Sequence, residues 1–148
     1  MLSSGSAFQD FVQGVDATDA LTKIYLDLSD TEYSRPFAVI SEAENGAFLT
    51  PGSNAIAYRG DFSLWLERDL TEDEYLNLSD SILAFDDEAS DIIEELIEDS
   101  YLPGGIVING VTSDGPTELV EQDAESEDPT IRYYLACRYL ISCGLDTN

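Results

Sequence analysis

Histidine is absent from this chain of 148 residues, and only six cationic side chains accompany 31 aspartates and glutamates. The lack of histidine removes the usual general base, the commonest zinc ligand and every Ser-His or Cys-His mechanism. The formal net charge of -25 repels phosphate backbones and anionic lipid, because the Lys and Arg patches that would neutralise them are missing. We therefore expect that the chain binds neither nucleic acid nor membranes directly.

Patterns that bind cofactors are also missing. No Gly-x-Gly-x-x-Gly run and no Gly-Lys-Ser/Thr run occurs, so nucleotide phosphate binding has no support. The two cysteines, Cys137 and Cys143, lie in one expected strand, where about 20 Å would separate them against the ~7 Å that a disulfide tolerates. The acidic residues at 123–128 lack the spacing of a calcium loop. We expect no cofactor, no metal and no catalytic residue.

Long apolar segments are missing as well. No run of 18 apolar residues appears, and the first residues contain neither the basic nor the apolar region of a signal peptide. These features predict a soluble chain without a cleaved signal.

Apolar residues are nevertheless plentiful, at 43% of the chain with 10% aromatic. A chain of this length forms one domain, here residues 1–148, that buries roughly 70% of its unfolded surface. A surface so acidic and so poor in lysine suits a protein that works in high salt, where screening weakens self-repulsion. A halophilic setting is one interpretation; a partner or an interior that needs a negative surface is the other.

Helical spacing appears in three places. Residues 8–15 repeat apolar side chains at three and four residues, with Ser6 as the expected cap. Thr71 and Glu74 form a capping box that predicts a helix start. A long helix is expected over residues 80–100. Its apolar side should hold Leu83, Phe85, Ala89, Ile92, Ile93, Leu96 and Ile97, and its outer side Asp87, Asp91, Glu94, Glu95 and Glu98.

Strands are predicted between these helices and after the last of them. The expected strands are residues 21–28, favoured over a helix there, and residues 35–40, 58–68, 106–111 and 131–143. In the strand expected at residues 58–68, one face holds Phe62, Leu64 and Leu66, which alternate with Asp61, Ser63, Trp65 and Glu67 on the other face. The closing strand exceeds the usual length and is expected to extend beyond its own core. Long loops are predicted near 42–57 and 114–130, with residues 118–129 mobile and solvated.

Two uses of the surface follow. Carboxylates of the long helix could imitate DNA phosphates and occupy a nuclease or repressor groove, against the plainer interpretation of a solvated helix exterior. Those residues are Asp87, Asp91, Glu94, Glu95, Glu98 and Asp99. Alternatively, the closing strand predicts a self-assembling subunit, in which a neighbour covers Tyr134, Ala136 and Leu140 on its outer side.

The order of these elements resembles the tail terminator (tail completion) proteins of long-tailed phages and related archaeal viruses, over about residues 8 to 144. The resemblance comprises an N-terminal helix, the strand Arg35-Pro36-Phe37-Ala38-Val39-Ile40, the strand Gly60-Asp61-Phe62-Ser63-Leu64-Trp65-Leu66-Glu67, a long helix, Ile106-Val107-Ile108-Asn109-Gly110 followed by Gly115-Pro116, and a long strand ending in Cys143-Gly144.

The resemblance implies an α/β (α+β) domain with a mixed, mostly antiparallel sheet flanked by helices. It further implies a homo-hexameric ring at the neck of the virion, where the ring ends the tail tube and docks to the head-tail connector or head closure protein. The genome would pass through an acidic bore without specific binding. We expect Trp65, Tyr134 and Leu140 at subunit contacts. Another neck protein of the same virion and an acidic DNA mimic remain the alternatives.

Overall fold

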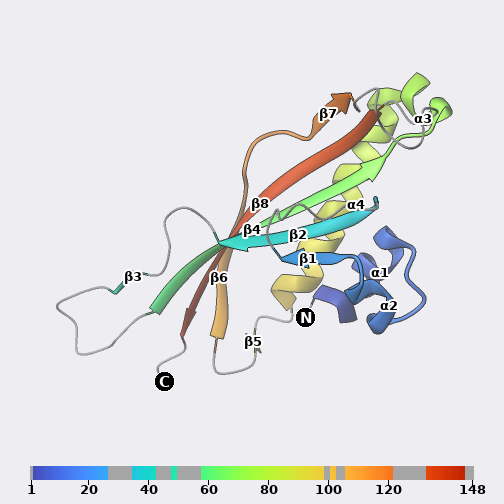
Figure 1. Ribbon diagram of the computed structural model, residues 1–148. Helices are drawn as coiled ribbons and strands as arrows, with labels where there is room; N and C mark the ends of the chain where they lie inside the picture. The colour runs from blue at the N-terminus through green and yellow to red at the C-terminus, as the bar shows by residue number, and fades with distance from the viewer. Residues whose placement is uncertain are drawn as a thin grey trace.

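The longest strand, β8 (Tyr133–Leu145), lies in the middle of an eight-stranded mixed sheet (Figure 1). The computed structural model describes residues 2–26, 35–42, 48–49, 58–98, 101–102, 106–121 and 133–145. The strand order is β1-β2-β4-β8-β6-β5, with β3 paired to β4 and β7 paired to β8. The other strands are β1 (Ile24–Leu26), β2 (Phe37–Glu42), β3 (Phe48–Leu49), β4 (Tyr58–Asp69), β5 (Tyr101–Leu102), β6 (Ile106–Ser113) and β7 (Glu118–Glu121).

Strand pairing is antiparallel everywhere except between β1 and β2. Strands β4 and β8 run together from Arg59 opposite Gly144 to Asp69 opposite Tyr134. On its other side β8 pairs with β6 along one part and with β7 along another. Both edges of β8 are thus paired within the sheet; the expectation that this strand extends beyond its own core stays a prediction.

The helices are η1 (Leu2–Ser4), α1 (Ser6–Val12), α2 (Ala17–Leu21), α3 (Glu72–Leu76) and α4 (Leu78–Glu98). Helix α2 begins after Asp16, whose side chain accepts a hydrogen bond from the backbone of Asp19. Helix α3 begins at the predicted capping box, with both of its hydrogen bonds formed. Local sequence therefore sets these two starts.

One face of the sheet is covered by helices. In Figure 1, α4 runs behind β4 and β8, while α1 and α2 lie beside β1. Phe8 and Phe11 of α1 and Phe85 of α4 are buried in one cluster with Leu64 and Leu66 of β4. The cluster also contains Val12, Ala20, Ala38, Leu70, Ala89, Ile92, Ile93, Ile108, Leu135, Cys137, Ile141 and Cys143. Burial of this apolar area supplies most of the driving force for folding.

The expected α+β class is confirmed: helices flank a mixed, mostly antiparallel sheet. The strands predicted at 35–40, 58–68, 106–111 and 131–143 all form, the third continuing to Ser113. The strand predicted over 21–28 is shorter, because Leu21 ends α2 and β1 begins at Ile24.

Several expectations about loops and faces are wrong. Residues 118–121 form β7 instead of a solvated loop, and Phe48–Leu49 form β3 within the expected loop at 42–57. The remainder of both predicted loops, apart from residues 114–117, lies largely outside the described residues. Val15 is 88% exposed, because α1 ends at Val12 and Gln13 has a left-handed backbone. Leu83 and Ile97 of α4 are exposed as well.

Candidate interaction surface on the helix-free face of the sheet

The three residues predicted at subunit contacts lie on the same face of the sheet, opposite the face that the described helices cover. We call it the helix-free face, because none of the described helices lies on it. The register places Trp65 opposite Arg138, Tyr134 opposite Asp69 and Leu140 opposite Ser63. Side chains on neighbouring strands point to the same face when they are directly opposed. All three side chains are half-buried. Nothing in the single chain tests the contacts, which stay a prediction.

Apolar side chains are buried on this face too. Phe37 and Val39 of β2 are 2% exposed and Ala136 of β8 is fully buried, yet none of them belongs to the core cluster under the helices. The ring of Tyr25 meets the Phe37 ring edge-on, at 5.6 Å between centroids. The expectation that a neighbour must cover Ala136 is therefore wrong, because the chain itself already buries it.

A charged cluster occupies the end of this face where β4 and β8 pair. The guanidinium of Arg35 lies 3.7 Å from the centre of the Tyr134 ring. Its Nε is 3.5 Å from Glu67 Oε1 and its Nη1 is 3.4 Å from Asp69 Oδ1. A cation over an aromatic ring is attracted by the ring's quadrupole. Arg35 thus joins two carboxylates and one aromatic ring on a single surface.

Burial of Glu67 controls its protonation. Desolvation raises the pKa of the Glu67 carboxyl, while the charge of Arg35 and hydrogen bonds with Trp65 and Arg35 oppose the rise. Desolvation also raises the pKa of the Tyr134 hydroxyl, and the nearby charge of Glu67 adds to that rise. Glu67 therefore interacts with both predicted contact residues, through a hydrogen bond with Trp65 and through its charge on the Tyr134 hydroxyl.

The composition of this face fits recognition. Trp, Tyr and Arg are the residues that most often contribute strongly to binding between proteins, and Trp65, Tyr134 and Arg35 lie together here. Within the described part of the chain, no group of three or more metal-ligating side chains is arranged to hold an ion. Sequence reasoning identified Trp65 and Tyr134 but missed Arg35 and Glu67, whose partners lie more than 30 residues away along the chain.

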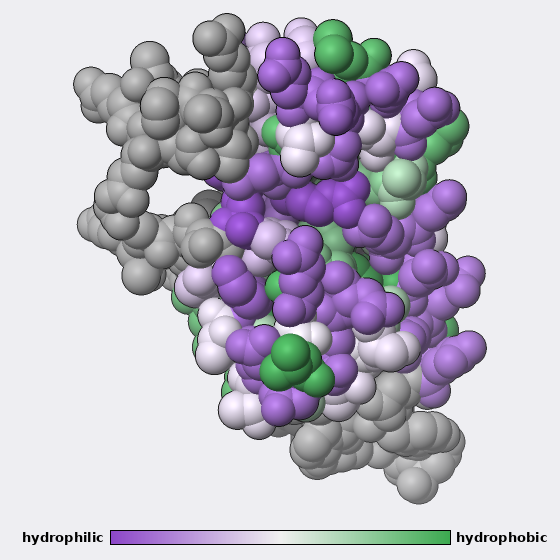
Figure 2. Space-filling view, turned by 90° about the vertical axis from the view of Figure 1, so that its right-hand side faces the viewer, coloured by the Kyte–Doolittle hydropathy of each residue, from purple (hydrophilic) through white to green (hydrophobic). Residues whose placement is uncertain are grey.

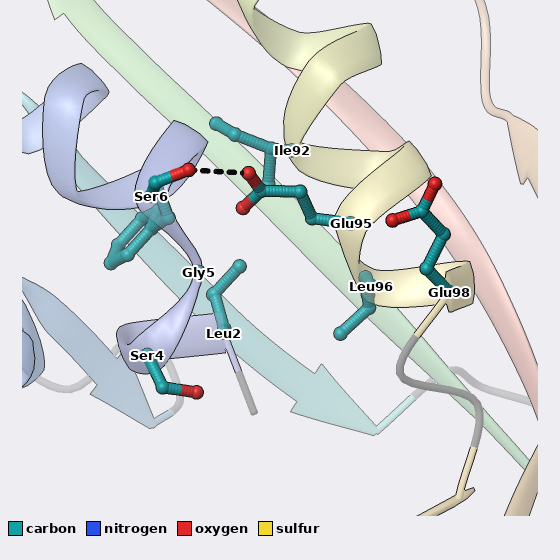
Figure 3. Close-up of a pocket in the computed structure, with 9 residues that line it drawn as sticks. Leu2, Ser4, Gly5, Ser6, Ile92, Glu95, Leu96 and Glu98 are labelled. Atoms are coloured by element: carbon teal, nitrogen blue, oxygen red, sulfur yellow. Dashed lines mark hydrogen bonds between the residues drawn. The ribbon is translucent and has the colours of Figure 1, made fainter.

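The carboxylates proposed to imitate DNA phosphates differ in whether they are exposed. Asp87, Asp91, Glu94 and Glu98 are exposed along α4, and Asp99 lies outside the described residues. Glu95 is engaged instead (Figure 3): its Oε1 accepts a hydrogen bond from the Ser6 hydroxyl at 2.7 Å, and its Oε2 accepts one from the backbone of Ala7 at 3.0 Å.

Glu95 thereby caps α1 from another helix. Ser6 is the first residue of α1 and donates to Glu95, so the expectation that Ser6 is the cap is wrong. The carboxylate is also favourably placed beside the positive end of the helix. Next to this contact a cavity of about 420 Å³ lies between the start of the chain and the end of α4, with Leu2, Phe8, Ile92 and Leu96 among its lining (Figure 3).

Cys137 and Cys143 form no disulfide, and both are buried on the helix-covered face. Burial raises the pKa of the Cys137 thiol to about 12, so the reactive thiolate is scarce at neutral pH. Both side chains belong to the apolar core cluster. None of the helices that the structure describes combines the length and apolar character needed to cross a bilayer.

No model of a known protein family matches the sequence, and no curated protein matches it significantly.

Proposed function

We propose that this chain is a non-catalytic structural subunit of a virion, which assembles with copies of itself into a ring at the head-proximal end of the tail tube. The proposal starts from the order of elements, which resembles tail terminator proteins, and the α+β fold is compatible with it. The observation that carries it is the helix-free face of the sheet, where Trp65 and Tyr134 lie half-buried beside the Arg35 cluster and Leu140 lies half-buried further along β8.

In the proposed ring, this face packs against the neighbouring copy. Half-buried aromatic side chains lose their remaining contact with water there, which favours association. The mutual repulsion of chains with a net charge of -25 opposes it. Salt screens that repulsion within a few ångströms. The ring should therefore form at high salt and dissociate at low salt, as a protein of a halophilic virus would require.

The proposed partners are the tail tube protein on one side of the ring and the connector or head closure protein on the other. DNA passes through the opening without being held, because an acidic wall repels phosphate. Neither a cofactor nor a catalytic residue enters this account.

Negative-stain microscopy and sedimentation velocity across a salt series test the proposal. The wild type should form closed rings at high salt. Trp65→Asp and Tyr134→Asp should remain folded but monomeric, because each places a charge in the proposed contact. Leu21→Asp is the matched control, since Leu21 is 59% exposed at the end of α2 on the other side of the molecule. Intact rings from both contact variants would refute the proposed surface.

The DNA mimic is the second candidate, and the exposed row of Asp87, Asp91, Glu94 and Glu98 favours it. Steps of four, three and four residues place these carboxylates on one face of α4, about 4.5 to 6 Å apart along the helix axis. A monomer that blocks a nuclease at a ratio of one to one, and loses that effect in Asp91→Asn with Glu94→Gln, would support this function. Rings without such inhibition would exclude it.

Another protein of the neck is distinguished by its binding partner. A tail terminator stops the growth of tube protein polymers, so adding it to polymerising tube protein should shorten the tubes. Binding to the connector without any effect on tube length would indicate a different position in the neck.

A further inference from the structure

The helix side of the molecule carries an apolar patch at the end where α3 lies. Figure 2, which views the molecule from the right-hand side of Figure 1, shows a mostly hydrophilic surface with one group of hydrophobic atoms at its top, the end where α3 lies, and another in its lower half. Leu76 of α3 is 73% exposed, Leu83 of α4 is 62% exposed and Tyr75 is 38% exposed. These three residues are called the α3–α4 patch below.

The scaffold under the patch is held by several contacts. The capping box fixes the start of α3. The Tyr75 ring stacks on the Tyr133 ring of β8, with 4.3 Å between centroids and planes only 7° apart. The Ser81 hydroxyl donates a hydrogen bond to the Glu74 carbonyl at 2.8 Å, which joins α3 to α4. Leu76 and Leu83 are thus presented to solvent on ordered helices and not on a loose segment.

Exposed carboxylates border the patch. Glu72 and Asp73 precede Leu76 by four and three residues in α3, and Asp80 and Asp87 flank Leu83 by three and four residues in α4; all four carboxylates are exposed. Residues three and four apart lie side by side on a helix. Each exposed leucine therefore has negative charges next to it on its own helix.

We infer that the α3–α4 patch binds a basic amphipathic helix of another protein. The apolar side of such a helix would cover Leu76 and Leu83, while its Lys and Arg side chains would meet the bordering carboxylates. Apolar anchors with flanking charges are how amphipathic helices bind grooves and surfaces. This inference does not depend on ring formation.

Charge disfavours a second copy of this chain as the occupant of this patch. The chain has six cations against 31 carboxylates. Three of the cations, Arg35, Arg68 and Arg138, already form ion pairs with carboxylates of their own chain. A second copy would therefore bring more negative charge to a border that is already negative.

Two synthetic peptides of about 16 residues, roughly four helical turns, serve as probes. Both contain leucine and lysine in equal numbers; one repeats leucine at three and four residues, and the other has the same residues in scrambled order. The patterned peptide should bind the wild type about tenfold more tightly than the scrambled one, and added salt should leave that ratio largely intact because it comes from apolar burial. Fluorescence anisotropy with labelled peptides measures both affinities.

The double variant Leu76→Ser/Leu83→Ser should bind both peptides equally. Its control, Leu119→Ser, removes a leucine of β7 that is 38% exposed and should keep the tenfold preference. All positions changed are exposed, so circular dichroism should show an unaltered fold. Equal binding of the two peptides to the wild type, or an unchanged preference in the double variant, would overturn the inference. So would self-association that the double variant abolishes, because it would identify a second copy as the occupant.

Discussion

The face of the sheet under α1 and α4 is filled by a continuous apolar core, whereas the opposite face combines a few buried apolar side chains with a charged cluster. On the covered face Phe85, Leu64 and Leu66 are almost completely buried among other apolar groups. On the helix-free face the buried carboxylate of Glu67 depends on Arg35, and Trp65 and Tyr134 stay half-exposed. The first face is complete within one chain, while the second has the composition of a contact surface.

The contrast also separates stability from assembly. On the covered face, stability comes mainly from apolar burial, which depends little on salt; the ion pair of Arg68 with Glu88 of α4 lies at the same face, with the guanidinium over the Phe85 ring. The cluster on the helix-free face depends on the protonation of Glu67 and on ionic screening. Substitutions on the first face should therefore affect folding, and those on the second should affect folding less and assembly more.

The largest effect is expected from Phe85→Ala. Phe85 is fully buried and its ring lies 6.0 Å from the Phe11 ring between centroids. Its truncation should lower the free energy of unfolding by about 3 to 5 kcal/mol. Leu83→Ala, two residues away in α4 and 62% exposed, should change it by less than about 0.5 kcal/mol. Urea titration at fixed high salt measures both; similar values would mean that α4 does not face the core as described.

A smaller effect is expected from Arg35→Met. The substitution leaves Glu67 buried without its cation, which should lower the free energy of unfolding by about 1 to 3 kcal/mol. Arg138→Met is the matched control, because the Arg138–Asp114 ion pair is largely exposed and such pairs contribute about 0 to 1 kcal/mol. The same urea titrations compare the two variants. Equal losses would show that the cluster on the helix-free face is an ordinary surface pair.

The smallest effect is expected from Glu67→Gln and depends on pH. Because the pKa of Glu67 is raised above 4.5 in the folded chain, its contribution to stability is present below pH 4.5 and is lost as pH rises through the raised pKa. Glutamine cannot titrate. The stability of the variant relative to the wild type should therefore increase with pH across this window. Urea titrations at several pH values and constant ionic strength test the sign, which a flat or falling difference would contradict.

Local patterns predicted the elements of the covered face well. The alternation along β8 and the capping box at Thr71 are patterns of neighbouring residues, so the sequence alone was sufficient to predict this strand and this helix start. In α4 the buried side runs through Ser81, Phe85, Ala89 and Ile92. The small polar Ser81 occupies the first of these buried positions, and Leu83, between Ser81 and Phe85 in the sequence, lies on the opposite side of the helix. Apolar character alone therefore misplaced Leu83.

Contacts between distant segments could not be predicted. Ser6 was a plausible cap by local pattern, but the carboxylate that caps α1 comes from Glu95, 89 residues away from Ser6. Arg35 and Glu67 are 32 residues apart, and only the register of β2 with β4 brings that part of the chain together. Alternation along β4 indicated that Trp65 and Glu67 share a face, but it could not show that the face holds a buried ion pair.

The fluorescence of Trp65 tests the central claim most directly, because this is the only tryptophan in the chain. The account places it on the surface that a neighbouring copy covers. At fixed high salt, raising the protein concentration through the range where rings form should shift its emission to shorter wavelength and reduce its quenching by acrylamide, a neutral quencher that the acidic surface does not repel. Rings that form while both signals stay unchanged would show that the helix-free face is not the subunit contact.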